Sequence, residues 1–217
     1  MMARITLFGA SGTIGVRILD EALRRGHTVT AVVRDVNRLT RDDSSLNVVA
    51  GDVLNAEDVV RYTKDQDVVI SAVGGGDGPG HQALIEPAAR SLVAGLRTLQ
   101  PGAPRLVVVN GAGSLRTAGG GQIWDTPGLP EFLLEIMHAH GDALAYLRGV
   151  DDVAWTVLSP AATITPGDRT GRYRTGGDDL VTDDAGVSAI STEDYAVALL
   201  DEVERPQHVG QRFTVAW

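Results

Sequence analysis

Three glycines near the start of the chain have the spacing of a turn that binds phosphate groups. Gly9, Gly12 and Gly15 follow an apolar run at 5–8 and precede an amphipathic stretch at 16–25. In such a turn the first glycine lets the chain leave a strand, the second lets the backbone approach a pyrophosphate, and the third lets a helix pack closely on the sheet. Free N–H groups at the helix N-terminus would bind the phosphates. We therefore expect a dinucleotide to contact Gly9, Ser11, Gly12, Thr13, Ile14 and Gly15.

Two arginines indicate which dinucleotide this turn would accept. An NAD site usually has an acidic residue about 20 residues after the glycines, where it holds the ribose 2′-hydroxyl. Arg34 stands near that distance here, and Arg38 follows within one helical turn. Guanidinium groups favour a 2′-phosphate, so the pair predicts NADP(H) in preference to NAD(H). Asp35 could instead accept a hydrogen bond from the ribose, and a solvated charged turn is the alternative without a ligand.

Further cofactor contacts are expected where other apolar segments end. Asp52 and Val53 follow the third such segment, and the aspartate could accept a hydrogen bond from the adenine amino group or simply belong to a turn. Ala72, Val73 and Gly74 end the fourth segment with small residues, which leave room for a ribose.

A serine and two histidines are the candidates for chemistry. Ser114 follows the fifth apolar segment, where its hydroxyl could donate a hydrogen bond to a substrate carbonyl or lie in an ordinary glycine-rich turn. His138 and His140 are two residues apart on one expected helix, so at most one readily faces the cleft. A histidine there could protonate a carbonyl oxygen near neutral pH, contact a ribose or be solvated. No further ligands surround the pair, so no metal site is expected.

The elements that would position these residues alternate along the chain. Expected strands are 5–8, 28–33, 47–50, 67–73, 105–110, 153–158 and 212–216, and expected helices are 16–25, 56–64, 81–99, 131–148 and 194–203. This order predicts an α/β fold: a Rossmann-like, doubly wound and mostly parallel sheet with helices on both faces. No repeat or linker divides the 217 residues, so we expect one domain over 1–217.

Two loops are long enough to border a substrate. Residues 113–130 carry Trp124, a candidate for stacking on the substrate, and residues 168–191 are expected to form a small C-terminal hairpin lobe. Ligands of open α/β sheets bind beyond the carboxyl ends of the strands, where both loops would lie. Ordinary surface loops are the alternative. Asp178 and Asp179 are expected to be solvated turn residues, and Trp155 a core residue.

Composition excludes several classes of function. The net charge of −9 disfavours nucleic acid as a partner, and no apolar run has the length needed to cross a bilayer. The absence of cysteine excludes disulfides and thiolate chemistry. No signal peptide is visible. We therefore expect a cytoplasmic monomer or homodimer that acts on a small molecule.

The ordered motifs resemble the atypical short-chain dehydrogenase/reductases, and more narrowly the NAD(P)H-binding proteins related to NmrA, biliverdin-IXβ reductase and proposed NADH-flavin reductases. The resemblance rests on segments 9–15, 51–53, 71–74, 110–114, 155–161 and 190–196. It implies a nicotinamide near the end of the fifth strand, in contact with the turn of Pro160, Ala161 and Ala162. It also implies that Ser114 occupies the position of the family's active-site serine, and that the second histidine, His140, faces the cofactor.

The chain departs from related dehydrogenases at their Tyr-x-x-x-Lys motif. In that motif the lysine lowers the tyrosine pKa and binds the ribose, but the one lysine here, Lys64, follows no tyrosine at the required spacing. Acceptors that need little acid catalysis are therefore favoured. We expect an NADPH-dependent oxidoreductase that transfers hydride to a flavin, quinone, enone or carbonyl. The alternatives are a noncatalytic NADP(H) sensor of the NmrA kind, or an isomerase or dehydratase that retains the cofactor.

Overall fold

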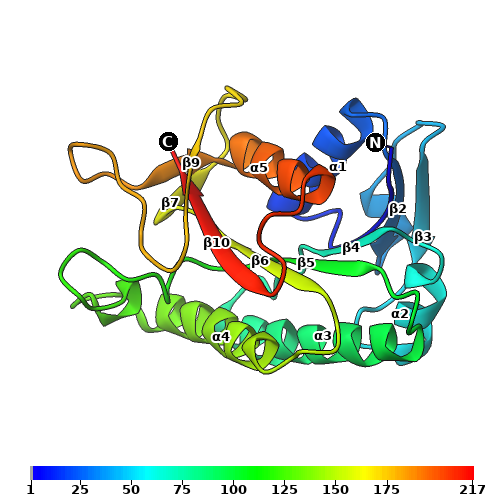
Figure 1. Ribbon diagram of the computed structural model, residues 1–217, viewed down its shortest axis with the longest axis horizontal. Coiled ribbons are helices and arrows are strands. Elements are labelled where there is room, and N and C mark those ends of the chain that lie inside the picture. Colours follow the sequence, from blue (N-terminus) through cyan, green and yellow to red (C-terminus); the bar gives the residue numbers. More distant parts are fainter. Residues whose placement is uncertain (1) are drawn as a thin grey trace.

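A twisted central sheet organises the chain in the computed structural model, which describes residues 2–217 (Figure 1). The strands are β1 (Arg4–Phe8), β2 (Thr28–Val33), β3 (Leu46–Ala50), β4 (Val68–Ser71), β5 (Arg105–Val109), β6 (Trp155–Ser159), β7 (Thr163–Thr165), β8 (Arg174–Gly176), β9 (Ala189–Ser191) and β10 (Gln211–Ala216). The helices are α1 (Thr13–Arg24), α2 (Ala56–Thr63), α3 (Gly78–Thr98), α4 (Glu131–Arg148) and α5 (Thr192–Glu204), with 3-10 turns at Val36–Arg38 and Ile123–Asp125.

The strand order confirms the expected Rossmann-like fold. Eight strands follow the order β3-β2-β1-β4-β5-β6-β10-β8, and all neighbours are parallel except β10 and β8. Helices α1 and α5 cover one face of the sheet, whereas α2, α3 and α4 cover the other (Figure 1). The order reverses between β1 and β4, and the carboxyl edge at such a switch point is where α/β sheets bind ligands.

Apolar side chains at helical spacing bind each helix layer to the sheet. Ile18, Leu19 and Ala22 of α1 are buried in one core, and Leu92 and Leu96 of α3 are buried in the other. Burial of each such leucine or isoleucine stabilises the fold by about 1.5–3 kcal/mol. No helix within residues 2–217 combines the length and apolar character needed to cross a membrane.

Most expected elements lie within a few residues of their observed positions. Helix α4 matches its expected span, and Trp155 is a core residue with 3% exposure. Helix α3 begins three residues before the expected start, because Asp77 caps it by accepting a hydrogen bond from the Gly80 N–H at 2.7 Å. Pro79 is compatible with this start, since the first turn of a helix does not need the N–H that proline lacks.

The segment 168–191 does not form the expected hairpin. Its first strand, β8, joins the main sheet antiparallel to β10, and its second strand, β9, pairs in parallel with β7 in a separate two-stranded sheet. Each strand has only three residues and a partner distant in sequence. The Gly and Asp residues of this segment therefore predicted a loop, but they did not indicate which strands β8 and β9 would pair with.

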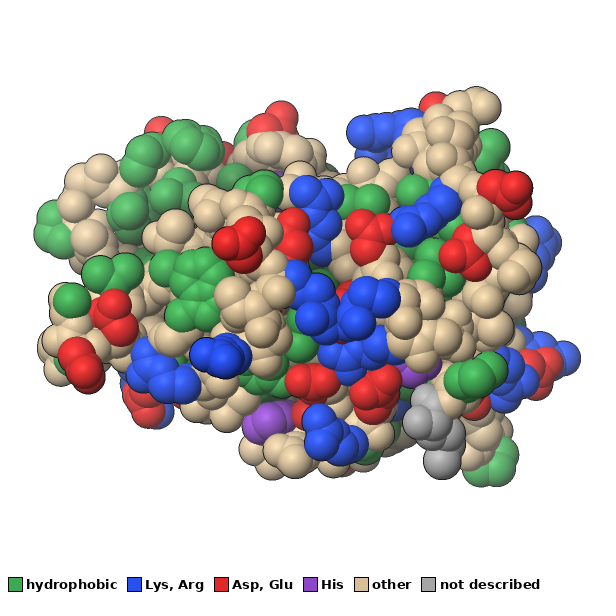
Figure 2. Space-filling view, turned by 90° about the horizontal axis from the view of Figure 1, so that it is seen from above, with side chains coloured by type: hydrophobic (Ala, Val, Ile, Leu, Met, Phe, Trp, Pro, Cys, Tyr) green, Lys and Arg blue, Asp and Glu red, His purple; other side chains and the backbone are tan. Residues whose placement is uncertain are grey.

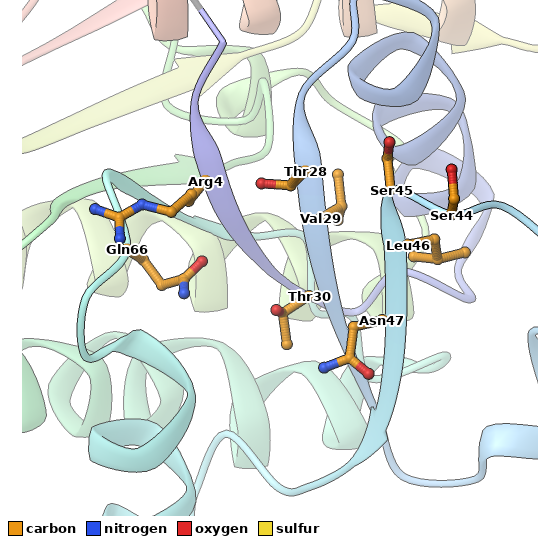
Figure 3. A pocket seen from close by; sticks show the side chains of 9 residues that line it. All are labelled: Arg4, Thr28, Val29, Thr30, Ser44, Ser45, Leu46, Asn47 and Gln66. Atoms are coloured by element: carbon orange, nitrogen blue, oxygen red, sulfur yellow. The ribbon is translucent and has the colours of Figure 1, made fainter.

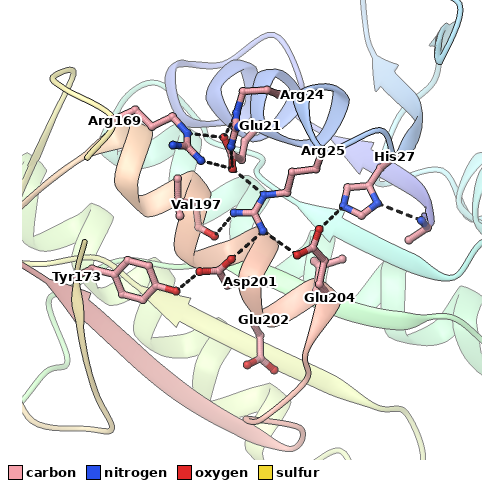
Figure 4. A network of polar contacts seen from close by, with 12 residues as sticks. Glu21, Arg24, Arg25, His27, Arg169, Tyr173, Val197, Asp201, Glu202 and Glu204 are labelled. Atoms are coloured by element: carbon pink, nitrogen blue, oxygen red, sulfur yellow. Dashed lines mark hydrogen bonds and ion pairs between the residues drawn. The ribbon is translucent and has the colours of Figure 1, made fainter. Parts of the chain in front are cut away.

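A network around a buried carboxylate fixes this segment to the helices above the sheet (Figure 4). Glu21 of α1 is 4% exposed and accepts hydrogen bonds from Arg24, Arg25 and Arg169 at 2.6–3.0 Å. Arg25 also pairs with Asp201 of α5 at 2.7 Å. Figure 2, which views this side of the molecule, shows basic and acidic side chains next to one another near its centre.

The segment 167–173 makes a second set of polar contacts with α5. The Gly171 N–H and the Thr170 hydroxyl donate to Asp194, which is fully buried, at 2.7 and 2.5 Å. The Tyr173 hydroxyl donates to Asp201 at 2.5 Å. Trp217, at the end of β10, also donates to Asp194 through Nε1 at 2.8 Å. Carboxylates of α5 thus hold this segment and the end of β10 in place.

Candidate functional site

The three glycines of the first turn have different structural roles. Gly9 has φ +81°, and a Cβ there would lie 2.4 Å from the carbonyl oxygen of Ala72. A Cβ on Gly15 would lie 2.0 Å from the carbonyl oxygen of Gly9. At Gly12 the same construction meets only the Gly9 oxygen, at 3.4 Å. Gly9 and Gly15 are therefore required by the packing of the protein itself, whereas Gly12 borders open space.

The start of α1 presents free backbone donors beside Gly12. Gly12 is the N-cap, no side chain caps the helix, and its first turn carries no acidic residue. The first intrahelical hydrogen bond comes from the Val16 N–H, so the N–H groups of Thr13, Ile14 and Gly15 have no intrahelical partner. Ser11 is half-buried and Thr13 is exposed. This arrangement fits the pyrophosphate of a dinucleotide, because the donors and the helix dipole both favour an anion.

Arg34 and Arg38 are both exposed where β2 ends at the same edge of the sheet. Neither forms an ion pair with any part of the chain that the structure describes. Asp35 caps the 3-10 turn between them, and its Oδ1 accepts hydrogen bonds from the backbone and side chain of Asn37 at 3.0 and 2.9 Å. The two guanidinium groups remain available to an anionic ligand, while one oxygen of Asp35 already has partners.

Asp52 and Val53 lie in the turn after β3. Asp52 Oδ1 accepts a hydrogen bond from the Leu54 N–H at 2.9 Å, and its own N–H donates to Asp58 at 3.0 Å. Val53 is buried in the core beneath α2 and α3. Asp52 is therefore part of this turn through its Oδ1, while its side chain stays exposed at the edge of the sheet.

The ends of β4 and β6 come together with the glycine turn at this edge. The Ala72 N–H donates to the Phe8 carbonyl at 2.9 Å, so the segment 72–74 runs directly beside Gly9. Two strands away, the Pro160 carbonyl accepts a hydrogen bond from Thr214 at 3.2 Å, Ala161 is buried and Ala162 is exposed. Val73 is half-buried beside the lower core. The fold therefore places all three expected backbone segments along one edge.

His140 lies against the end of β5. Its Nδ1 is 3.0 Å from Oδ1 of Asn110, and a Cβ on Gly111 would be 3.2 Å from the His140 side chain. Burial and the neighbouring His81 lower the pKa of His140 to about 4. That value differs from the near-neutral titration expected for a proton donor, because burial and the neighbouring His81 both disfavour the charged ring.

Ser114 has different neighbours from His140. Arg212, whose side chain is 1% exposed, donates from Nη1 to Ser114 Oγ at 2.8 Å, and Gln122 donates to the Ser114 carbonyl at 3.1 Å. A guanidinium only donates, so the serine hydroxyl keeps its own hydrogen for another acceptor.

The aspartates of the loop 168–191 were expected to be solvated, which is wrong for Asp178. This residue pairs with Arg212 at 2.5 Å and with Arg148 at 2.7 Å. Asp179 is exposed but pairs with Arg116 at 2.7 Å, which joins this loop to the loop 113–130. The sequence pattern did not indicate the pairing of Asp178 with Arg212, because Arg212 lies on a strand 34 residues later in the chain.

The aromatic residues Trp124 and Tyr195 and the lysine Lys64 remain to be placed in the structure. The Trp124 ring packs against His138 at a tilt of 31° with centroids 4.7 Å apart, and Gly141 leaves room for it on α4. Lys64 follows α2 and lies on an element away from β5 and α4. Tyr195 is fully buried and donates its hydroxyl to the Leu158 carbonyl at 2.7 Å. No tyrosine–lysine pair therefore forms at this edge among the described residues.

Two surface hollows do not include any expected cofactor residue. One, of about 240 Å³, lies where β1, β2 and β3 begin, at the opposite edge of the sheet (Figure 3). It is lined mostly by neutral polar side chains such as Thr28, Ser45 and Asn47. The other, of about 530 Å³, borders β8 and Trp217. The free backbone donors of α1 and the exposed Arg34 and Arg38 lie instead at the carboxyl edge.

Several neighbours of the site were not anticipated from sequence, chiefly His81, Gln122 and Arg212. Their positions depend on contacts between elements far apart in the chain. His81 could have been found from its place in the first turn of the helix after β4, because helix N-termini at the carboxyl edge of such a sheet adjoin the ligand.

Comparison with known proteins identifies the family. The profile of an NAD(P)H-binding family matches residues 9–203. The uncharacterized protein YwnB of Bacillus subtilis (strain 168) is 41% identical over 217 residues, which span 98% of this chain and 97% of YwnB. A structure from Bacteroides thetaiotaomicron, provisionally named an epimerase, is 38% identical with a TM-score of 0.90, over 100% of this chain and 98% of the other. One from Streptococcus pneumoniae TIGR4, provisionally named an NADH-flavin reductase, is 30% identical with a TM-score of 0.85, over 99% of each chain. The chain therefore belongs to this NAD(P)H-binding family, which agrees with the resemblance to NmrA-like, atypical short-chain dehydrogenase/reductases.

Proposed function

We propose that the protein is an NADPH-dependent oxidoreductase that reduces a small conjugated acceptor. The observation that carries this proposal is the open space at Gly12, which adjoins free N–H groups on the same sheet edge as Arg34 and Arg38. Gly9, Ser11, Gly12, Thr13, Ile14 and Gly15 would hold the pyrophosphate. The segments 72–74 and 160–162 would border the nicotinamide and its ribose, and Asp52 and Val53 the adenine.

The bound cofactor would supply a hydride, and the chain would position the acceptor and stabilise its developing charge. Ser114 is proposed to donate a hydrogen bond to the acceptor, since Arg212 already occupies an acceptor position of its hydroxyl. The neutral His140 would accept a hydrogen bond through Nε2, because its Nδ1–H is directed to Asn110. The loops 113–130 and 168–191, joined by Arg116 and Asp179, would form the outer wall of a single-domain site.

The acceptor that this site favours is a flavin or quinone. Such molecules delocalise the charge that hydride addition creates and so need less acid catalysis than a simple ketone. The chain has no tyrosine–lysine pair, and His140 stays neutral at physiological pH. The name of the Streptococcus pneumoniae relative agrees with this choice.

Arg34→Ala tests the choice of cofactor. We expect the affinity for NADPH to fall about 10–100-fold, because one charge-assisted hydrogen bond to a 2′-phosphate is worth about 1.5–3 kcal/mol. The affinity for NADH, which lacks that phosphate, should stay near that of the wild type. Calorimetric titration with both cofactors measures the two changes, with Arg61→Ala on α2 as a surface control. Equal losses for NADPH and NADH would contradict a 2′-phosphate contact.

Ser114→Ala tests the proposed hydrogen-bond donor. We expect kcat with a quinone to fall about 100-fold, while NADPH affinity remains unchanged. Steady-state kinetics and calorimetry separate the two effects. If the variant turns over like the wild type, Ser114 is a structural partner of Arg212 and not part of the reaction.

A noncatalytic NADP(H) sensor is the second candidate. The low pKa of His140 leaves that residue without a proton to donate near neutral pH, as a binding protein would permit. Tight NADPH binding without oxidation across flavins, quinones, enones and carbonyls would favour the sensor. An isomerase with retained cofactor would instead convert substrate without net NADPH oxidation.

A further inference from the structure

Two histidines from different helices meet at the carboxyl ends of β4 and β5. His81 lies in the first turn of α3 and His140 lies on α4, and their ring centroids are 5.6 Å apart at an interplanar angle of 56°. His81 adjoins Gly74, and His140 adjoins Gly111. The pair therefore borders the segments that we assign to the nicotinamide side of the cofactor.

Hydrogen bonds to oxygen define which nitrogen of each ring is free. His81 Nδ1 is 2.7 Å from the Asp77 carbonyl oxygen, and a carbonyl only accepts, so Nδ1 carries the hydrogen. The remaining nitrogen, Nε2, lies 3.6 Å from the position that a Gly74 Cβ would occupy. The atom of His81 that can gain and lose a proton thus lies beside the cofactor segment.

Both histidines are half-buried, and they differ in what surrounds the ring. His81 lies in a turn that begins at the surface. The Nδ1 of His140 is held by Asn110, which is 4% exposed, and burial and the neighbouring His81 lower the pKa of His140 to about 4. His140 is therefore neutral near neutral pH, which leaves His81 as the histidine of the pair that could bring a proton to a ligand.

The ionisable groups near His81 leave its ring free of ion pairs within the described chain. Asp77 uses its Oδ1 to accept the Gly80 N–H at 2.7 Å. Glu135 of α4 packs against Gly78, three residues before His81. His140 is the ring that faces it.

We propose that His81 supplies the proton that completes reduction of the acceptor, with His140 as a fixed neutral neighbour. The inference rests on the proposed reductase function. The acceptor gains an electron pair as hydride from NADPH and carries a negative charge on an oxygen or nitrogen. The Nε2–H bond of His81 breaks, a new O–H or N–H bond forms on the acceptor, and neutral His81 regains a proton from water. His81 then does the work that a tyrosine–lysine pair does in related enzymes.

His81→Gln tests the proposal in turnover, with Gln82→Ala on the same exposed turn as the matched control. We expect kcat with a quinone to fall about 100-fold in His81→Gln, with NADPH affinity unchanged and a larger solvent deuterium isotope effect. Gln82→Ala should match the wild type in all three. If the wild type turns over and His81→Gln equals it, the role of His81 is overturned and the reductase function stands. If the wild type does not oxidise NADPH with any acceptor, both fail.

Nitrogen NMR of the ligand-free protein tests the geometry without turnover. The signals of His81, assigned by their loss in His81→Gln, should show hydrogen on Nδ1 in the neutral ring and proton exchange at Nε2 as the pH is lowered. His140 should show the same tautomer and remain neutral near neutral pH. A neutral His81 with its hydrogen on Nε2 would overturn the proposal. The ring would then take up its second proton at Nδ1 and not at the nitrogen that faces Gly74.

Discussion

Gly12→Ala is expected to fold like the wild type and to lose about 100-fold in affinity for NADPH. The backbone at this residue has φ −82° and ψ 168°, an extended conformation that alanine adopts without strain. Its Cβ would meet only the Gly9 oxygen, at 3.4 Å, which is an ordinary contact. The methyl group would instead fill the space beside the free N–H groups of α1 and separate the pyrophosphate from them. Loss of one or two charge-assisted hydrogen bonds of about 1.5–3 kcal/mol each gives a loss of this size.

Gly15→Ala is the matched control, because it adds the same methyl group three residues later. A Cβ there would lie 2.0 Å from the Gly9 carbonyl oxygen and force α1 away from the sheet, at a cost of about 1–3 kcal/mol or more. Thermal unfolding and NADPH titration of both variants give the comparison. The roles assigned to the two glycines would be wrong if Gly12→Ala bound NADPH like the wild type, or if Gly15→Ala were as stable as Gly12→Ala.

Glu21→Gln is expected to lower the free energy of unfolding by about 3–5 kcal/mol, the usual cost of removing one partner from a buried ion pair. Glu21 is 4% exposed and its two oxygens bind Arg24, Arg25 and Arg169. When Glu21 is neutralised, the partly buried Arg25, with 12% exposure, keeps only its partners on α5. Arg169 of the loop 168–191 loses its ion pair with α1. Glu86→Gln removes a more exposed pair with Arg90 and should cost less than about 1 kcal/mol.

The same network predicts the pH dependence of stability. Burial alone would raise the pKa of Glu21, but hydrogen bonds from Arg169, Arg24 and Arg25 lower it far below the usual value. A carboxyl whose pKa is lower in the folded than in the unfolded state stabilises the fold above its unfolded pKa, and this stability is lost as the pH falls toward the folded pKa. The free energy of unfolding of the wild type, measured with denaturant, should fall as the pH is lowered through the acidic range. The slope of this free energy against pH should be shallower in Glu21→Gln. Equal slopes would contradict the role given to Glu21.

The sequence was enough to predict the fold, and the fold brings the expected cofactor residues to one edge of the sheet. Parallel strands are buried on both faces, so β1, β2 and β5 read as apolar runs. Gly9 and Gly15 are explained by close backbone contacts, to the Ala72 carbonyl and to the Gly9 carbonyl respectively. These are local signals, because each depends on a few consecutive residues.

The protonation and partners of the site could not be predicted in the same way. Ser114 meets Arg212 from a strand 98 residues later, and His140 meets Asn110 and His81 from two other elements. The low pKa of His140 is a property of that enclosure and not of the helix that carries it. The strands β8 and β9 were missed for a similar reason, since each has only three residues and a partner distant in sequence.

The proposed reductase function is tested most directly by following oxidation of protein-bound NADPH when flavins, quinones, enones and carbonyls are added in turn. We predict acceptor-dependent oxidation, fastest with a flavin or quinone and slowed when the C4 hydrogen of NADPH is replaced by deuterium. NADPH that binds tightly and stays reduced with every acceptor would contradict a reductase and favour a sensor.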